Sequence, residues 1–451
     1  MRRHLRASIG VIAFGMLLLF SPGALRAEIP GVVDNTVTLT AKEGYISTPE
    51  ANSIYMWGFA LDDGPMQYPG PTLIFTKGQD VEVTLVNQLP GGRNVSIVFP
   101  GQDNVQFVGG VPGLITREAA PGGQVTYKFK AKELGTYLYS SGTNLELQVE
   151  MGLVGALIVK HPDLTLKKAY DHDDTAYDEE VLFLETEIDP WVHWLVENGQ
   201  GNLVDNTAWW PVYWFLNGRA APDTMLPAGW PLLPSQPYDC MPMVHPGEKL
   251  LLRIVNAGRD LHPFHPHGNN ITIIARDGRI LTSNAADPTV GPDLSESNFT
   301  ITLPPGGTAD AIFTWTGKGL GWDIYGHMQD RDEEPTGNFP GPEDVDHDGD
   351  GVFDSVPLHP SGTENAEDHG KPFPVILPDV KDMTIGTMYS GSPYLGAAGH
   401  LPPGEGGFNP TAGYFYMWHS HKEKEMVNND VFPGGMMTMF LVVPYDAGGM
   451  P

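Results

Sequence analysis

Two short runs of alternating histidines carry the clearest chemistry in this sequence. One run holds His262, His265 and His267, and the other holds His419 and His421 on either side of Ser420. Alternate side chains of a β-strand point to the same face, so each His-x-His pair can present two imidazoles to one ion. Imidazole is a good ligand for copper and zinc. The two runs together therefore predict a metal site, and copper is the metal we expect.

The elements that must position these histidines are strands of an all-β protein. Alternating or continuous apolar runs at 81–86, 125–129, 250–256, 270–275 and 439–443 predict strands, and Gly and Pro turns separate them. We predict one β-sandwich over residues 28–162 and a second over 163–451. Both histidine runs fall in the second sandwich. A polar, Gly- and Pro-rich insertion at about 316–412 is expected to interrupt it.

A run of alternating carboxylates within that insertion predicts a second kind of metal site. Calcium is coordinated by six to eight oxygens, and a glycine at the sixth position lets a short loop wrap around one ion. The expected calcium ligands are Asp346, Asp348, Asp350 and Asp354, with Asp344 as a further candidate. The alternative is a solvated acidic linker. Bound calcium would have a structural role, because it would order the insertion.

The N-terminal segment indicates an exported protein. Residues 1–27 begin with arginines, continue through an apolar run and end in small residues, as a secretory signal peptide does. We therefore expect a periplasmic or extracellular location. No other run is long and apolar enough for a membrane span. The formal net charge of −29 argues against nucleic acid as a partner and favours metal cations.

The single cysteine excludes an intrachain disulfide and a thiolate cluster. Cys240 begins the run Cys240-Met241-Pro242-Met243, which His245 follows closely, so soft ligands gather there. Such ligands could hold Cu(I), although methionine and cysteine more often serve in packing. Five tryptophans between Trp191 and Trp214 could line a cleft or a subunit interface, but burial in the sandwich core explains most of such a stretch.

The motifs as a whole resemble those of the multicopper oxidases. Pro69-Gly70-Pro71-Thr72-Leu73, Gly78–Val81 and Asn87–Leu89 look like the opening of that family's first cupredoxin domain. The His262–Gly268 run and the Trp418–His421 run are similar to its third and fourth copper motifs. The resemblance covers nearly the whole chain after residue 27. It implies two cupredoxin-like Greek-key sandwiches, with a long loop insertion in the second.

The resemblance also assigns roles to the histidines and shows which ligands are missing. It implies that His262 faces the type 1 copper, whereas His265, His267, His419 and His421 face the trinuclear cluster. Ser420 stands where the family has the type 1 cysteine, and Lys424 and Glu425 stand near the position of its second histidine. In the first domain, four cluster histidines are replaced, by Val98, Pro100, Ser140 and Gly142.

These losses lead us to expect an exported, multicopper-oxidase-like protein with one mononuclear copper site and reduced or absent oxidase activity. If it is active, it is a copper-dependent oxidoreductase. One alternative is a non-catalytic structural or interaction module of an extracellular assembly. Another is a working oxidase of metal ions or phenols with a rearranged copper set. Resemblance to two-domain oxidases also suggests a homotrimer.

Overall fold

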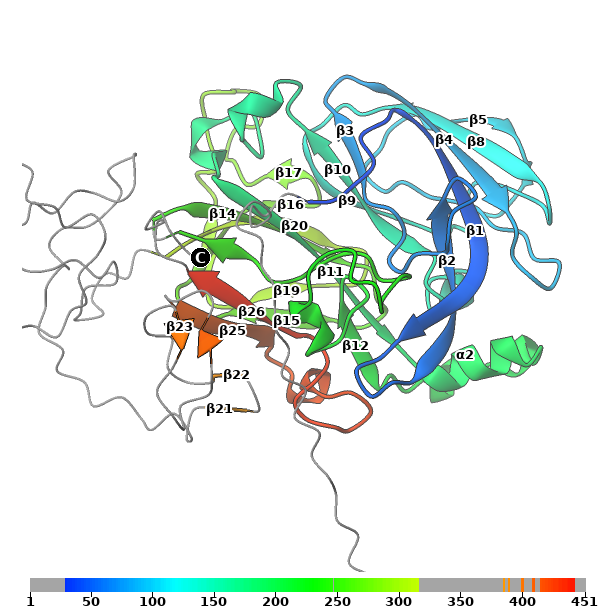
Figure 1. Cartoon of the computed structure of the whole chain (residues 1–451). Helices are drawn as coiled ribbons and strands as arrows, with labels where there is room; N and C mark the ends of the chain where they lie inside the picture. Colours follow the sequence, from blue (N-terminus) through cyan, green and yellow to red (C-terminus); the bar gives the residue numbers. More distant parts are fainter. Residues whose placement is uncertain are drawn as a thin grey trace, which may run out of the picture.

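The structure is a computed structural model that describes residues 29–245, 247–315 and 414–442. It also gives the backbone of four two-residue strands, β21 (Thr384–Ile385), β22 (Met388–Tyr389), β23 (Gly399–His400) and β24 (Phe408–Asn409). The expected signal peptide and all the expected calcium ligands lie outside the described residues. Figure 1 shows two β-sandwiches side by side, and their strands make up most of the described chain.

The first sandwich consists of a five-stranded and a three-stranded sheet. The order in the larger sheet is β2 (Ser53–Leu61), β1 (Thr36–Ser47), β4 (Asp80–Asn87), β8 (Gln124–Lys130) and β5 (Gln106–Gly109). The order in the smaller sheet is β3 (Leu73–Thr76), β10 (Val154–Lys160) and β9 (Gly135–Ser140). A small hairpin joins β6 (Val111–Pro112) to β7 (Arg117–Glu118). Strand β4 alternates buried and outward residues, as its sequence predicts.

The second sandwich pairs a seven-stranded sheet with a five-stranded sheet. The larger sheet runs β12 (Tyr213–Leu216), β11 (Glu179–Ile188), β14 (Lys249–Asn256), β20 (Thr308–Thr314), β16 (Ile271–Arg276) and β17 (Arg279–Ile280), with β18 (Glu296–Asn298) also paired to β16. The smaller sheet runs β13 (Met243–Val244), β26 (Met437–Val442), β25 (Tyr414–Ser420), β15 (His262–Pro266) and β19 (Ile301–Leu303).

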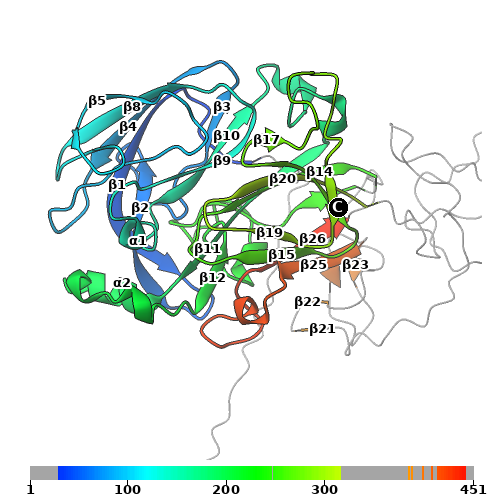
Figure 2. The same ribbon diagram turned by 180° about the vertical axis from the view of Figure 1, so that it is seen from behind.

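Helices in the described chain are short and lie in the connections. They are α1 (Leu145–Gln148), α2 (Pro190–Glu197) and the 3₁₀ turns η1 (Leu164–Leu166), η2 (Asp173–Thr175), η3 (Gly201–Leu203), η4 (Asn206–Ala208), η5 (Asp223–Met225) and η7 (Glu423–Met426). Helix α2 starts at Asp189, whose carboxylate accepts a hydrogen bond from the backbone N–H of Trp191. It packs beside β2 at one edge of the molecule (Figure 2).

The two sandwiches share a buried interface. Strands β14 and β20 of the second sandwich contact β9 of the first. Polar groups cross this interface, because Thr136 of β9 donates a hydrogen bond to Asp310 of β20 and accepts one from Arg253 of β14. The sheet that contains β15, β25 and β26 lies on the far side of the second sandwich from the first (Figures 1 and 2). The histidine strands therefore belong to an outer sheet.

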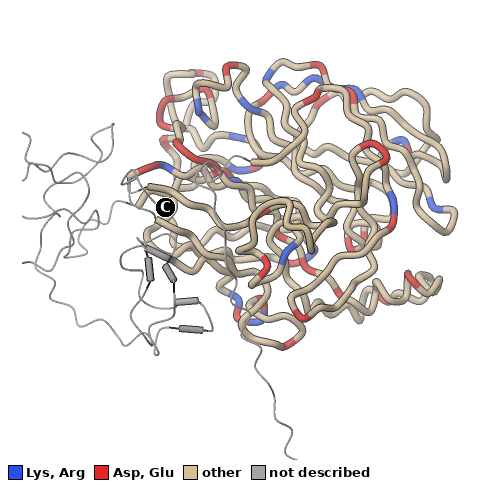
Figure 3. The backbone as a smooth tube through the Cα atoms, in the orientation of Figure 1, with Lys and Arg blue, Asp and Glu red and all other residues tan. Residues whose placement is uncertain are grey.

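The predicted all-β fold class is confirmed, because strands form two β-sandwiches. The excess of acidic over basic residues in the sequence is distributed over the described surface. Figure 3 shows Asp and Glu interspersed with Lys and Arg along both sandwiches. Among the described residues, no helix is both long and apolar enough to cross a membrane.

Candidate metal centre

Strands β15 and β25 run antiparallel and place the two histidine runs side by side. Their register pairs His265 with His419 and Phe264 with Ser420. Because side chains alternate along a strand, His265 and His419 point away from the sandwich core, whereas His262, Phe264 and Ser420 point into it. The two faces of one sheet therefore carry two separate polar clusters.

The outer cluster brings three imidazoles together. One ring nitrogen each of His265, His267 and His419 lies within 4.8 Å of the other two. The Nε2 atoms of His267 and His419 are 3.1 Å apart. Nitrogen ligands about 2 Å from one ion lie roughly 3 Å from each other, so this spacing fits a bound metal. His421 is exposed beside them, and its ring centroid is 5.1 Å from that of His265.

Neighbouring carbonyls orient these rings. His265 Nδ1 hydrogen-bonds to the carbonyl of Phe299, and His419 Nδ1 lies 2.7 Å from the carbonyl of Ser420. A ring nitrogen that donates to a carbonyl carries the proton, which leaves the Nε2 lone pair for a metal. Burial, reinforced by the adjacent imidazoles, lowers the pKa of His265 and His419 and brings the pKa of His267 to about 4. The rings are therefore neutral at pH 7 and ready to coordinate.

The cluster opens onto a shallow depression at the surface. Its walls are formed by residues 265–270 and by Phe299. A metal ion held there would be accessible to small molecules. Among the residues that the structure describes, no other group of three His, Cys, Asp or Glu side chains converges in this way.

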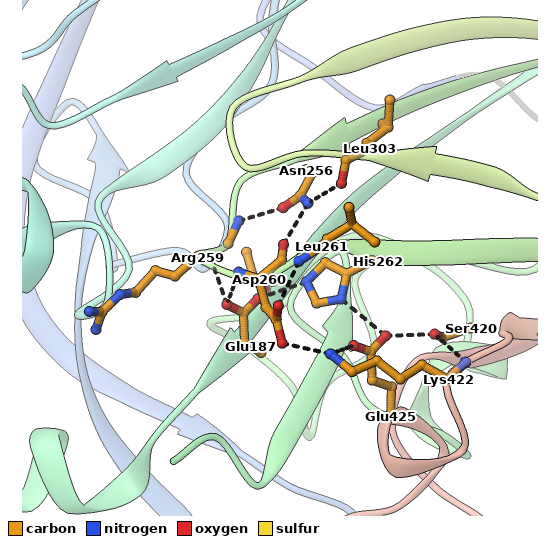
Figure 4. A network of polar contacts seen from close by, with 12 residues as sticks. Glu187, Asn256, Arg259, Asp260, Leu261, His262, Leu303, Ser420, Lys422 and Glu425 are labelled. Atoms are coloured by element: carbon orange, nitrogen blue, oxygen red, sulfur yellow. Dashed lines mark hydrogen bonds and ion pairs between the residues drawn. The ribbon is translucent and has the colours of Figure 1, made fainter. Parts of the chain in front are cut away.

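The inner cluster surrounds His262 (Figure 4). Its Nε2 lies 2.8 Å from Glu187 Oε2, and its Nδ1 lies 3.0 Å from Glu425 Oε2. All three side chains are fully buried. Burial opposes a charge on the ring, but the hydrogen bond to Glu187 and the proximity of Glu425 outweigh it and raise the pKa of His262 to about 10. This arrangement favours a protonated His262 at neutral pH.

Further polar groups complete this inner network. Ser420 donates a 2.6 Å hydrogen bond to Glu425, whose other oxygen lies 3.1 Å from Lys422 Nζ. Lys422 also pairs with Asp260 at 2.6 Å. Of the residues at or near the positions where the resemblance places type 1 ligands, His262, Ser420 and Glu425 converge, whereas Lys424 lies over the ring of Trp210. Strand alternation places His262 on the opposite face from the other predicted metal ligands.

Two glutamates of β11 belong to this region, and sequence reasoning missed both. Glu187 also accepts hydrogen bonds from the backbone N–H groups of Arg259 and Asp260. Glu185 is fully buried, and its oxygens have no hydrogen-bond partner within the described chain. Burial, with the charges of Glu425 and Glu187, raises the pKa of Glu185 to about 8, so it is largely protonated at pH 7. The sequence did contain a signal for them, because Glu185 and Glu187 are two acids, two residues apart, near the end of a largely buried strand.

The first sandwich repeats the strand pairing of the metal centre without its ligands. Val98 and Ser140 form an antiparallel bridge, as His265 and His419 do in the second sandwich. A Cβ atom at Gly142 would lie 2.6 Å from Val98 Cγ1, so Val98 fills the space that a side chain at 142 would need. Packing of Val98 therefore closes the space at position 142.

A separate hollow lies between α2 and the first sandwich. Its lining includes Trp191, Trp194 and Trp210, which are exposed, whereas Trp214 of the same stretch is buried. The rings of Trp191 and Trp194 stack with centroids 4.7 Å apart. Core burial therefore explains Trp214 but not these three tryptophans.

Comparison with known proteins agrees with the fold and the motifs. The profile of the family described as multicopper oxidase matches residues 64–163. The chain is 33% identical over 145 residues to "Multicopper oxidase MCE" of Talaromyces pinophilus, and the match covers 32% of this chain and 22% of that protein. It is 30% identical over 186 residues to "Laccase 1" of Metarhizium robertsii, and this match covers 38% and 28%. The matched segment thus spans about a quarter of each relative.

Solved structures show the same architecture. The blue copper oxidase of Nitrosomonas europaea superposes with a TM-score of 0.52 at 18% identity, and the match covers 90% of this chain and 85% of that one. The multicopper oxidase mgLAC gives the same score at 18% identity, with 91% and 87% covered. The family match over residues 64–163 and the shared architecture therefore make this chain similar to the multicopper oxidases.

Proposed function

We propose that this protein holds one mononuclear copper ion at His265, His267 and His419, with His421 as a further ligand beside them. The convergence of three neutral imidazoles on one face of the outer sheet carries this proposal. All four histidines come from the second sandwich, so the site needs no residue of the first. A copper ion bound there would supply a one-electron redox centre.

We also propose that the protein does not couple substrate oxidation to four-electron reduction of oxygen. Two observations support this. At the type 1 positions, Ser420 stands in place of the thiolate, and His262 lies between the carboxylates of Glu187 and Glu425. The four first-domain positions hold Val98, Pro100, Ser140 and Gly142, none of which supplies an imidazole.

Metal analysis of the copper-loaded protein tests the proposed site. We expect about one Cu(II) per chain, with the electron paramagnetic resonance spectrum of ordinary Cu(II) and without an intense blue colour. The double variant His419→Ala, His421→Ala should bind no Cu(II). The variant His161→Ala, which changes a half-buried histidine outside both clusters, is the matched control and should bind Cu(II) as the wild type does. Unchanged Cu(II) binding in the double variant would overturn the proposal.

The two alternatives predict different results in the same experiment. A structural or interaction module without copper chemistry would retain no copper after dialysis. A working oxidase with a rearranged copper set would oxidise a phenol or a metal ion with full reduction of oxygen to water. The filled type 1 position argues against the second of these.

Export and calcium binding are further proposals that rest on the sequence. The N-terminal run of residues 1–27 supports cleavage and secretion to the periplasm or beyond, which N-terminal sequencing of the mature protein tests.

The acidic loop Asp346, Asp348, Asp350 and Asp354 supports a structural calcium ion. Calcium analysis of the wild type against an Asp348→Asn, Asp350→Asn variant tests it. Light scattering tests the homotrimer that resemblance to two-domain oxidases suggests.

A further inference from the structure

Methionines gather on the outer face of the sheet that carries the histidines. Three buried methionines and three half-buried ones form one cluster together with Ala221 and Leu441. They come from η5, from β13 and the residues before it, from β25 and from β26, and are Met225, Met241, Met243, Met417, Met437 and Met439. Six of the eight side chains in this cluster are therefore thioethers.

The other apolar clusters of the described chain are built differently. The core of the first sandwich contains Met151 as its one methionine, and the core of the second contains only Met436. The cluster at the junction of the two sandwiches contains Met56 and Met66. Leu, Ile, Val and aromatic residues fill the remaining positions. Packing alone does not require methionine, so its concentration on one face needs a separate reason.

The strand register makes this methionine cluster continuous with the histidine cluster. Met417 pairs with Met439, and His419 pairs with Met437, across the β25–β26 ladder. His419 pairs with His265 on its other side, across the β15–β25 ladder. Directly opposed side chains share a face and have Cβ atoms about 5 Å apart. One cross-strand row therefore reads His265, His419, Met437, and thioethers continue from its end.

The cluster is close to the surface on one side. Met225, Met241 and Met417 are half-buried, whereas Met437 and Met439 are almost fully covered. The segment around η5 lies against β26, because Thr224 donates a 2.7 Å hydrogen bond to the carbonyl of Met437. Cys240 does not belong to this group, since its thiol packs in the core of the second sandwich and donates to the carbonyl of Leu216.

We propose that this methionine cluster is a second copper site, selective for Cu(I). Thioethers are soft, neutral ligands that prefer Cu(I) over Cu(II), whereas imidazoles bind either ion. The ligands with outward access are Met225, Met241 and Met417, and Met437 joins them to the histidine cluster. The proposal uses a different ion and different ligands from the histidine site, so it does not depend on the function proposed above.

Anaerobic titration with Cu(I), in competition with a chromophoric Cu(I) chelator, tests this site. The experiment uses the full chain carrying His419→Ala and His421→Ala, so that the histidine cluster cannot supply the ligands. This protein should still bind Cu(I), and X-ray absorption should show copper–sulfur scattering. Adding Met225→Leu, Met241→Leu and Met417→Leu should weaken Cu(I) binding by roughly tenfold or more, because Leu fills the same space without a sulfur.

A matched triple variant separates a specific site from a general effect of methionine content. Met56→Leu, Met66→Leu and Met151→Leu change three buried methionines around the first sandwich and should leave Cu(I) binding unaltered. Thermal unfolding followed by circular dichroism shows that both triple variants fold. Cu(I) binding that survives the substitutions at 225, 241 and 417, or scattering from nitrogen alone, would overturn the proposal. Loss of Cu(II) binding in the histidine variant tests only the other site.

Discussion

At the scale of single residues, the replacement of a thiolate by a hydroxyl changes what its neighbours can do. A copper ion in a blue site needs a deprotonated soft ligand, whereas Ser420 offers a hydrogen-bond donor that Glu425 accepts at 2.6 Å. Together with Glu187, Glu425 in turn raises the pKa of His262. The three side chains stabilise each other, so no one of them can be changed without affecting the other two.

The first prediction concerns Ser420→Cys. This variant should not become blue on addition of copper, because Glu425 still holds Nδ1 of His262 and no second histidine is present. The absorption spectrum of the copper-loaded variant measures this. The double variant Ser420→Cys, Glu425→His removes the carboxylate and adds the imidazole, and it should give a stronger blue absorption than the single variant. An intense blue colour in the single variant would contradict our account of the inner network.

The second prediction concerns Glu425→Gln, which keeps the shape of the side chain but removes its charge. Removing one partner of a buried ion pair costs about 3–5 kcal/mol, and because Glu187 still pairs with His262 we expect a loss near the lower end of this range. Urea unfolding should show a loss of this size in the free energy of unfolding. Glu423→Gln changes an exposed acid in the same turn and should cost less than about 0.5 kcal/mol. Equal effects of the two substitutions would show that the inner network adds no stability.

At the scale of elements, strand alternation separates the two polar clusters. Strand β15 presents His262 and Phe264 to the core and His265 to the outside, although all three lie within four residues. The same pairing of two strands occurs in both sandwiches, at Val98 with Ser140 and at His265 with His419. The same antiparallel pairing thus brings histidines together in one sandwich and packs Val98 against Ser140 in the other. Side chains decide the difference.

The third prediction tests the packing of the first sandwich. Gly142→Ala should destabilise the protein by about 1–3 kcal/mol, because the new Cβ would lie 2.6 Å from Val98 Cγ1. Thermal or urea unfolding measures the loss. Adding Val98→Ala removes the clashing methyl group, so the double variant should cost less than the sum of the two single variants. Strict additivity of the two substitutions would show that residues 98 and 142 do not compete for the same space.

At the scale of the whole molecule, a buried polar network ties the two sandwiches together. Arg253 of β14 reaches Glu180 of β11 at 3.0 Å and Asp310 of β20 at 3.4 Å. Lys160 of β10 pairs with Glu180, and Thr136 of β9 with Asp310, so the first sandwich takes part. Burial alone would raise the pKa of Glu180, but the charges of Arg253 and Lys160 outweigh it and hold that pKa below its usual range.

The fourth prediction follows from the sign of that shift. A carboxyl whose pKa is lower in the folded than in the unfolded chain stabilises the fold above the unfolded value, about 4.3 for Glu. That contribution is lost as the pH falls from there through the lowered pKa. Urea unfolding of the wild type should therefore show a falling free energy in this acidic window, and Glu180→Gln should flatten the fall. Glu82→Gln removes the acid of an exposed ion pair with Lys128 and should leave the fall in the free energy of unfolding unaltered.

The sequence alone determined the sheets, the family resemblance and the outer histidines. Period-two patterning is a local property of a strand, so 81–86 and 250–256 could be assigned as strands from neighbouring residues. The same periodicity placed His265 with His267 on one face. The absence of a thiol at Ser420, and hence of a blue site there, is likewise a matter of residue type.

Only the tertiary structure decided the role of His262 and the extent of the methionine face. Glu187 precedes His262 by 75 residues and Glu425 follows it by 163, and no local pattern indicates that their carboxylates meet one imidazole. The six methionines likewise come from four separate segments of the chain. Register between distant strands decides which side chains become neighbours, and burial then decides their charge. Both are properties of the assembled sandwich rather than of any one segment.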